Sequence, residues 1–85
     1  MPLFGLLLLM EKFNTIIAVI FKIPVQSVSD MLTSKDIPDW DSMNYLLCIA
    51  ELEKQFGISF TMDEVLKADS VGSLKTALLS KGVIL

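Results

Sequence analysis

Apolar residues recur at helical spacing in three parts of the chain. The first stripe has intervals of three and four residues and comprises Phe13, Ile16, Ile17, Ile20 and Phe21. Such spacing places the side chains on one face of an amphipathic helix. Pro24 ends this helix, because proline disfavours the α conformation in the residue before it.

A second helix is predicted over residues 42–56. Gly57 follows it and suits the position after a helix end, because glycine tolerates positive φ. Two apolar stripes run along this helix, although one is enough for a helix packed on one side of a small bundle. The longer stripe, which we assign to the core, comprises Tyr45, Cys48, Ile49, Leu52 and Phe56. The shorter stripe covers the first two turns and comprises Met43, Leu46, Leu47 and Ala50. It is either additional core beneath a long loop or an exposed docking patch.

Two further segments complete the helical pattern. Thr61 and Glu64 have the spacing of a capping box, which predicts a short helix after them. A last helix is expected to begin after Asp69 or Ser70 and to end before Gly82. Its apolar positions are Val71, Leu74 and Leu78.

Residues 23–41 show no long periodic segment and predict a loop with at most one short helical turn. Loops of this length in a small domain are usually functional or disordered, or they indicate that an element has been missed. The whole pattern predicts an all-α fold, a small four-helix bundle of three main helices and one short helix, with the long loop between helices 1 and 2. Residues 10–85 form a single domain in this prediction, and residues 1–9 form an apolar extension. That extension either lengthens the first helix or precedes a true start at Met10.

The apolar extension is too short to be a membrane span. A span needs about twenty apolar residues in a row, and Glu11, Lys12 and Asn14 interrupt the run. The basic segment and cleavage site typical of a secretory signal are not evident either. We therefore expect no stable membrane insertion. The single cysteine cannot form an internal disulfide and fits the reducing cytoplasm.

The chain carries a net charge of −3 and contains no histidine and no arginine. Nucleic-acid binding depends on clustered basic residues, so we expect none. Without histidine the chain lacks the usual general base, and with one cysteine it cannot assemble an ordinary zinc site. We therefore expect a protein that is not an enzyme and has no metal of its own. Other proteins would supply the chemistry.

Ser42 begins the second helix, and a serine in that position is most often just an N-cap. Its neighbours favour another interpretation. The run Trp40-Asp41-Ser42-Met43 resembles the Asp-Ser-Leu signature of acyl and peptidyl carrier proteins, with methionine in place of leucine. Residues 49–60, where Phe-Gly-Ile follows an acidic segment, and residues 70–74, Ser-Val-Gly-Ser-Leu, resemble the same family in the same order. The resemblance covers roughly residues 10–82.

The resemblance implies that a separate phosphopantetheinyl transferase esterifies Ser42 with 4′-phosphopantetheine, using coenzyme A and a divalent cation. The thiol of this arm would carry an acyl or aminoacyl group as a thioester between acyl-loading and acyl-using enzymes. Asp41 matches the family aspartate at the metal site of the transferase, and it can also complement the helix N-terminus. The free amides at a helix start suit the phosphodiester of such an arm.

The sequence departs from the family pattern where partners dock. Fatty-acid carriers have a run of acidic residues on the exposed face of the second helix. This chain has lost much of that charge, because the corresponding positions are Asn44, Leu47, Ala50, Glu53 and Lys54. We therefore expect partner binding that depends on apolar contact more than on salt. The residues expected to contact partners are Trp40, Met43, Leu46, Leu47 and Ala50. This departure favours a carrier of a specialised fatty-acid, polyketide or related pathway.

Three other interpretations stay open. A carrier-like fold that is never modified would serve only as an interaction module, and a transferase assay distinguishes it from a carrier. A peptidyl or D-alanyl type of carrier would bear aminoacyl groups instead of acyl groups. Self-association through the apolar extension and the shorter stripe is the third, although we expect a monomer.

Overall fold

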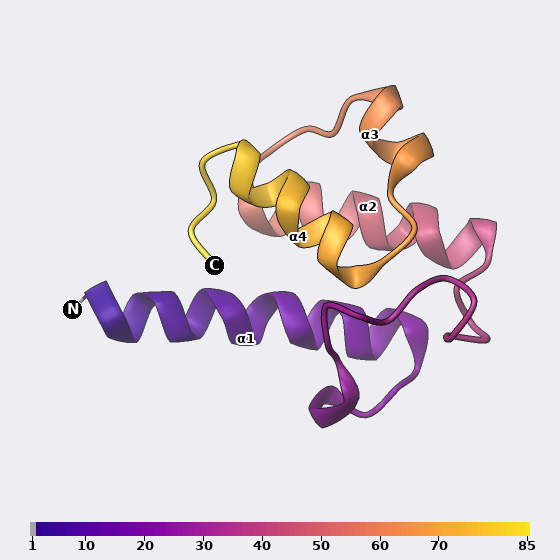
Figure 1. Ribbon diagram of the computed structural model, residues 1–85. Helices are drawn as coiled ribbons and strands as arrows, with labels where there is room; N and C mark the ends of the chain where they lie inside the picture. Colours follow the sequence, from indigo (N-terminus) through magenta and orange to yellow (C-terminus); the bar gives the residue numbers. More distant parts are fainter. Residues whose placement is uncertain (1) are drawn as a thin grey trace.

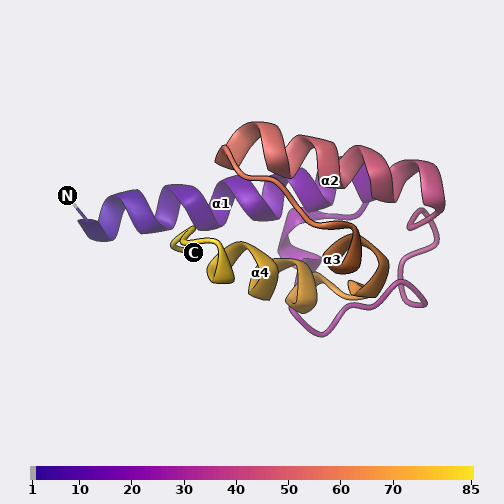
Figure 2. The same ribbon diagram turned by 90° about the horizontal axis from the view of Figure 1, so that it is seen from above.

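The computed structural model describes residues 2–85, and side chains from Leu8 onward. Its elements in chain order are α1 (Pro2–Phe21), the 3₁₀ turn η1 (Val25–Ser27), α2 (Ser42–Phe56), α3 (Met62–Lys67) and α4 (Val71–Ser80). Helices α2 and α4 run opposite to α1, and α3 lies toward the end of the bundle where α2 begins (Figures 1 and 2). The predicted all-α bundle of three main helices and one short one is confirmed, and so is the long loop between α1 and α2.

The core consists of the apolar stripes of the three main helices. Side chains that are 0% exposed include Phe13, Ile17, Phe21, Cys48, Leu52, Val71, Leu74 and Leu78. The longer stripe of α2 lies in this core, because Cys48, Ile49 and Leu52 are buried and Tyr45 and Phe56 pack against them. Burial of this apolar surface is the main stabilising contribution in so small a domain.

Helix α1 ends at Phe21, three residues before Pro24. Lys22 adopts a left-handed conformation with φ of 58°, and the Ile23 amide donates to the Ala18 carbonyl at 3.0 Å. This is the geometry of a Schellman-type ending, in which glycine is the usual residue. A lysine in this conformation costs on the order of 1 kcal/mol, so the turn is held by its surroundings and by the following proline.

The long loop is attached to the start of α4 by backbone hydrogen bonds. The Ser34 amide donates to the Asp69 carbonyl at 2.8 Å, and the Gly72 amide donates to the Asp30 carbonyl at 3.0 Å. A Cβ on Gly72 would lie 2.9 Å from that Asp30 oxygen, which is too close for any other residue without a shift. Ile37, only 2% exposed, fixes the middle of the loop on the core. The loop is therefore ordered and gives the start of α2 a defined position.

The apolar extension continues directly into the first helix, since α1 begins at Pro2. Both views show this part of α1 projecting past the other helices, at the end of the molecule away from the start of α2 (Figures 1 and 2). Within residues 2–85, none of the helices combines the length and the apolar character that crossing a bilayer requires. The division into residues 1–9 and a domain of residues 10–85 stays a prediction.

Helix α3 is short and depends on contacts at its first turn. The predicted capping box is confirmed, because Thr61 Oγ1 accepts from the Glu64 amide at 3.1 Å and Glu64 Oε1 accepts from the Thr61 amide at 2.8 Å. The same Glu64 oxygen lies 2.7 Å from Lys81 Nζ, just after α4. The hydrogen bond from Lys81 and then that from the Thr61 amide lower the pKa of Glu64 below its ordinary value of 4.5.

The lowered pKa predicts acid destabilisation centred on α3. A carboxyl whose folded pKa is depressed stabilises the fold fully above its unfolded pKa, and this contribution is lost as the pH falls through the folded pKa. We expect the free energy of unfolding to fall between about pH 6 and about pH 3, and to fall less in Glu64→Gln, which keeps the capping box. Urea unfolding at about pH 6 and about pH 3 measures this fall in the free energy of unfolding. The control is Asp63→Asn, since the Asp63–Lys67 pair is exposed. If the free energy of unfolding of this variant depended on pH as weakly as that of Glu64→Gln, the assignment to Glu64 would be contradicted.

Candidate functional site

The first turn of α2 is organised by Asp41. Its Oδ1 accepts a hydrogen bond from the Asn44 amide at 2.8 Å, and its carbonyl accepts from the Tyr45 amide at 2.8 Å. Asp41 is therefore the N-cap, and Ser42 is the first residue of the helix. The expectation from position alone, that the serine caps the helix, is wrong because the preceding aspartate already fills that role.

The Ser42 hydroxyl is left available by this arrangement. The side chain is exposed, and among the described side chains it takes part in no hydrogen bond. Within the described residues, the backbone amides of Ser42 and Met43 also have no hydrogen-bond acceptor, as expected for the first turn of a helix. An anion attached to this hydroxyl would meet those amides and the positive end of the helix dipole. The residues present therefore fit a phosphodiester at this position.

The shorter apolar stripe of α2 lies at the surface. The exposed fractions of Met43, Leu46 and Leu47 are 74%, 57% and 54%, and Ala50 is also exposed. These four residues, called the α2 patch below, do not form additional core beneath the long loop. They follow Ser42 on the same helix, so a protein that reaches Ser42 meets apolar surface within the next two turns.

Trp40 attaches the loop to the bundle immediately before the site. Its ring stacks between Phe21 at 4.7 Å and Tyr45 at 5.7 Å, measured between ring centroids. The Tyr45 hydroxyl donates to the Val65 carbonyl of α3 at 2.6 Å. Burial, and to a smaller extent the nearby Cys48 and Asp69, raises the pKa of Tyr45 above 10.0. The phenol therefore keeps its proton and remains a donor at neutral pH.

A cleft of about 300 Å³ opens beside Ser42, between the start of α2 and α3. Its lining combines apolar side chains with a few polar groups: Ser34, Trp40, Ser42, Tyr45, Leu46, Val65, Leu66, Ala68 and Asp69. This volume lies at the lower end of the range for small-molecule sites. Of the residues predicted for the site, Trp40, Ser42 and Leu46 meet here, whereas Met43, Leu47 and Ala50 do not line the cleft.

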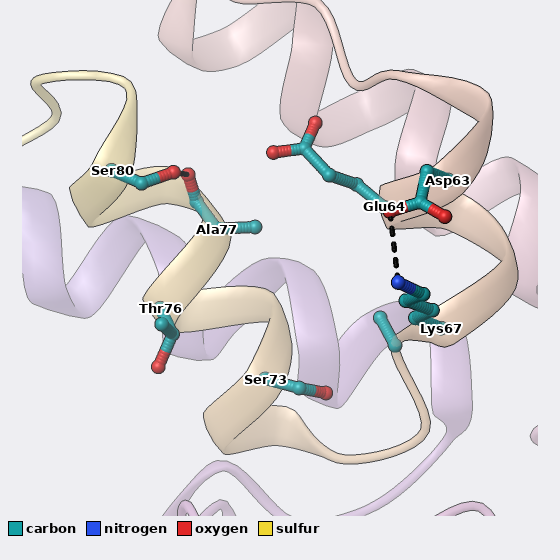
Figure 3. Close-up of a pocket in the computed structure, with 8 residues that line it drawn as sticks. Asp63, Glu64, Lys67, Ser73, Thr76, Ala77 and Ser80 are labelled. Carbon is teal, nitrogen blue, oxygen red and sulfur yellow. Dashed lines mark hydrogen bonds and ion pairs between the residues drawn. The ribbon is translucent and has the colours of Figure 1, made fainter.

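A second hollow of about 270 Å³ lies between α3 and α4. Figure 3 shows Asp63, Glu64 and Lys67 on one side and the short side chains of α4 on the other. Asp63 and Lys67 form an ion pair at 3.2 Å, and Glu64 pairs with Lys81. None of the residues predicted for the site lines this hollow, and its charged groups already have partners. We assign no chemistry to it.

Cys48 takes no part in the surface of the site. The side chain is 0% exposed, and burial raises the pKa of its thiol to about 12. Because the thiolate is the reactive form, this cysteine is inert at neutral pH. Its place on the core stripe of α2 makes it a small apolar residue of the bundle.

Two features of the site escaped prediction from the sequence. The Tyr45–Val65 hydrogen bond joins residues twenty positions apart, and Asp69 and Ser34 reach the cleft from different loops. Spacing along one helix cannot show such pairs. The only available signal was a tyrosine on a core stripe, because a buried phenol generally finds a hydrogen-bond partner.

The fold belongs to the class of small helical carrier proteins. A solved structure from Mycobacterium tuberculosis, named as an acyl carrier protein, is similar with a TM-score of 0.77 and 22% sequence identity. The similarity covers 86% of this chain and 97% of that one. At this identity it shows the fold alone. A comparison with curated proteins found no match.

The sequence itself identifies the family. A family model described as the phosphopantetheine attachment site matches residues 11–78. The chain therefore belongs to this family, which confirms the resemblance to acyl carrier proteins, and the protein is a carrier with covalently attached 4′-phosphopantetheine. Such carriers interact with a phosphopantetheinyl transferase and with acyl-handling enzymes, which perform the catalysis.

Proposed function

We propose that Ser42 bears the phosphopantetheine arm and that the protein delivers an acyl or aminoacyl group to partner enzymes of a specialised fatty-acid, polyketide or related pathway in the cytoplasm. The observation that carries the proposal is the exposed Ser42 hydroxyl at the start of α2. This hydroxyl is not used to cap the helix, because Asp41 is the N-cap. It stands beside the unpaired first amides of the helix, where a phosphodiester is stabilised.

The chain contributes position and charge to the attachment reaction. The Ser42 oxygen attacks the diphosphate phosphorus of coenzyme A that bears the pantetheine. The bond from this phosphorus to the bridging oxygen breaks, and adenosine 3′,5′-bisphosphate leaves. The transferase must take the hydroxyl proton, because the chain contains no histidine. Asp41 Oδ1 is engaged by the Asn44 amide, and its other oxygen can face the divalent cation of the transferase. Once attached, the arm supplies a thiol that holds the cargo as a thioester.

The proposal is tested by intact mass after incubation with coenzyme A, magnesium and a broad-specificity phosphopantetheinyl transferase. We expect the wild-type protein to gain one phosphopantetheine and Ser42→Ala to gain none. Ser59→Ala is the matched control, because Ser59 is also exposed, near the other end of α2. It should be modified like the wild type.

The opposite result would favour the interaction-module alternative. That alternative is supported by the α2 patch, which lacks the acidic residues through which many carriers meet their partners. If the folded wild-type protein gains no mass from several transferases that modify a control carrier, the attachment proposal is wrong. Modification of Ser42→Ala would place the attachment at another residue.

We further propose that the α2 patch, together with Trp40, forms the partner surface. Met43, Leu46 and Leu47 are each more than half exposed, and contiguous exposed apolar surface generally marks a contact site. The patch itself contains no charged residue. The nearest acids, Asp41 and Glu51, flank it in the sequence, and Glu53 on the next turn accepts from the Phe60 amide at 2.9 Å. Contact with partners therefore depends on apolar burial.

A charge placed in the α2 patch is predicted to weaken docking without unfolding the protein. We expect Leu47→Asp to raise the KM of the transferase by about tenfold or more, because the aspartate would be desolvated at the interface. The wild-type KM should change little with salt concentration. Leu79→Asp is the control, since Leu79 is similarly exposed at 49% but lies on α4. Equal effects of the two variants would contradict a specific docking role for the patch.

A further inference from the structure

The cleft beside Ser42 and the apolar core are separated by a wall one residue thick. Four side chains line the cleft and also pack directly against the core: Trp40, Tyr45, Val65 and Ala68. The core against which this wall packs includes Cys48, Leu52 and Leu74, all 0% exposed. An acyl chain that left the cleft for the interior would have to pass between these four residues.

The wall is held closed by Tyr45. Its ring stacks on Trp40, which in turn stacks on Phe21 of α1. Its hydroxyl donates to the Val65 carbonyl at 2.6 Å, which joins α2 to α3 across the cleft floor. Opening the wall requires this hydrogen bond to break and at least one aromatic contact to be lost.

Helix α3 is also fixed from its other side. Glu64 pairs with Lys81 at 2.7 Å, and both side chains are about three-quarters or more buried, with 26% and 18% exposed. A movement of α3 away from α2 would strain this pair together with the Tyr45 hydrogen bond. Protein interiors are close-packed, and the side chains of this core are buried, so a chain could enter only by displacing them.

We propose that Tyr45, backed by Trp40, excludes the cargo from the core, and that this carrier bears short or polar acyl groups in the surface cleft and does not shelter long alkyl chains. This inference rests on the proposed attachment at Ser42. The cleft is only about 300 Å³ and carries polar groups on Ser34 and Asp69. A short or polar group can form hydrogen bonds there, whereas a long alkyl chain would leave much of its surface in water.

The test compares acetyl and octanoyl forms of the full chain, loaded by the transferase from the corresponding acyl-coenzyme A. Loading is first verified by intact mass. We expect the core amide signals of Leu52 and Leu74 and the Tm to be the same in both forms of the wild-type protein. In Tyr45→Ala, the octanoyl form alone should shift those signals and raise the Tm.

Two further variants make the result specific to the wall. Leu66→Ala removes a side chain that lines the cleft but is 76% exposed and belongs neither to the wall nor to the α2 patch, so its core signals should be independent of the octanoyl group, as in the wild type. Tyr45→Phe keeps the ring and removes the hydrogen bond, and it replaces Tyr45→Ala in the test if that variant does not fold. In Tyr45→Phe we expect an octanoyl-dependent shift of the core signals that is smaller than the shift expected for Tyr45→Ala. An absence of such shifts in folded Tyr45 variants would overturn the role of Tyr45.

The outcomes separate this inference from the proposed function. No mass gain in the wild type means that attachment itself fails. A mass gain followed by octanoyl-dependent shifts of Leu52 and Leu74 in the wild type leaves attachment intact and overturns the exclusion of cargo from the core.

Discussion

Replacement of Phe21 by alanine is expected to destabilise the fold strongly. Phe21 is 0% exposed and stacks on Trp40 at 4.7 Å, so the change leaves a cavity and releases the loop before α2. Substitutions of this kind cost about 3–5 kcal/mol. A chain of this length has a total stability of about 4–13 kcal/mol, so Phe21→Ala should lose between about a quarter and all of it. Urea unfolding followed by fluorescence measures the loss.

The fluorescence signal is well defined because Trp40 is the only tryptophan. Val19→Ala is the control, since Val19 lies on the same helix but is 69% exposed. Its effect should stay within about 0.5 kcal/mol. A loss below about 1 kcal/mol in Phe21→Ala would show that the aromatic stack is not a principal element of the core.

Replacement of Asp41 by asparagine should separate its two roles. Asparagine and aspartate are equally good N-caps, so the helix cap is retained, and the loss of charge costs at most about 1 kcal/mol of stability. If Asp41 also contacts the cation of the transferase, the rate of modification at Ser42 should fall by about 10- to 100-fold. A mass-based time course gives that rate, and urea unfolding gives the stability.

Two further variants serve as comparisons for Asp41→Asn. Asp41→Ala loses the cap as well and should cost about 1 kcal/mol more than the asparagine variant. Asp39→Asn is the matched control, because Asp39 lies two residues away and contributes only its carbonyl to α2, as acceptor for the Asn44 side chain at 2.9 Å. An unchanged rate in Asp41→Asn would reduce Asp41 to a structural cap.

The helices were predictable because their signals are local. The capping box at Thr61, the glycine after α2 and the proline after α1 each act within a few residues, and α2 has the predicted bounds of residues 42–56. Gly57 indeed has φ of 64°, as a helix ending of this kind requires. The core stripe of α2 followed from periodicity alone, since only one face of the helix can meet the bundle.

The parts that the sequence did not reveal depend on contacts between distant segments. Whether the shorter stripe of α2 was core or surface could not be decided from spacing, because both faces carry apolar residues. The close approach of Gly72 to Asp30 and the wall formed by Tyr45 and Val65 arise only when loop, α3 and α4 come together. Ser42 became a candidate only through its family motif, since its position suggested a cap that Asp41 in fact provides.

The burial of Cys48 has a practical consequence for labelling the protein. With its side chain fully covered and the pKa of its thiol raised to about 12, Cys48 presents almost no thiolate to an alkylating reagent at neutral pH. The thiol at the tip of the phosphopantetheine arm would then be the group that reacts. A maleimide dye can therefore report loading and unloading of the carrier directly, in the unaltered sequence, without first replacing the native cysteine.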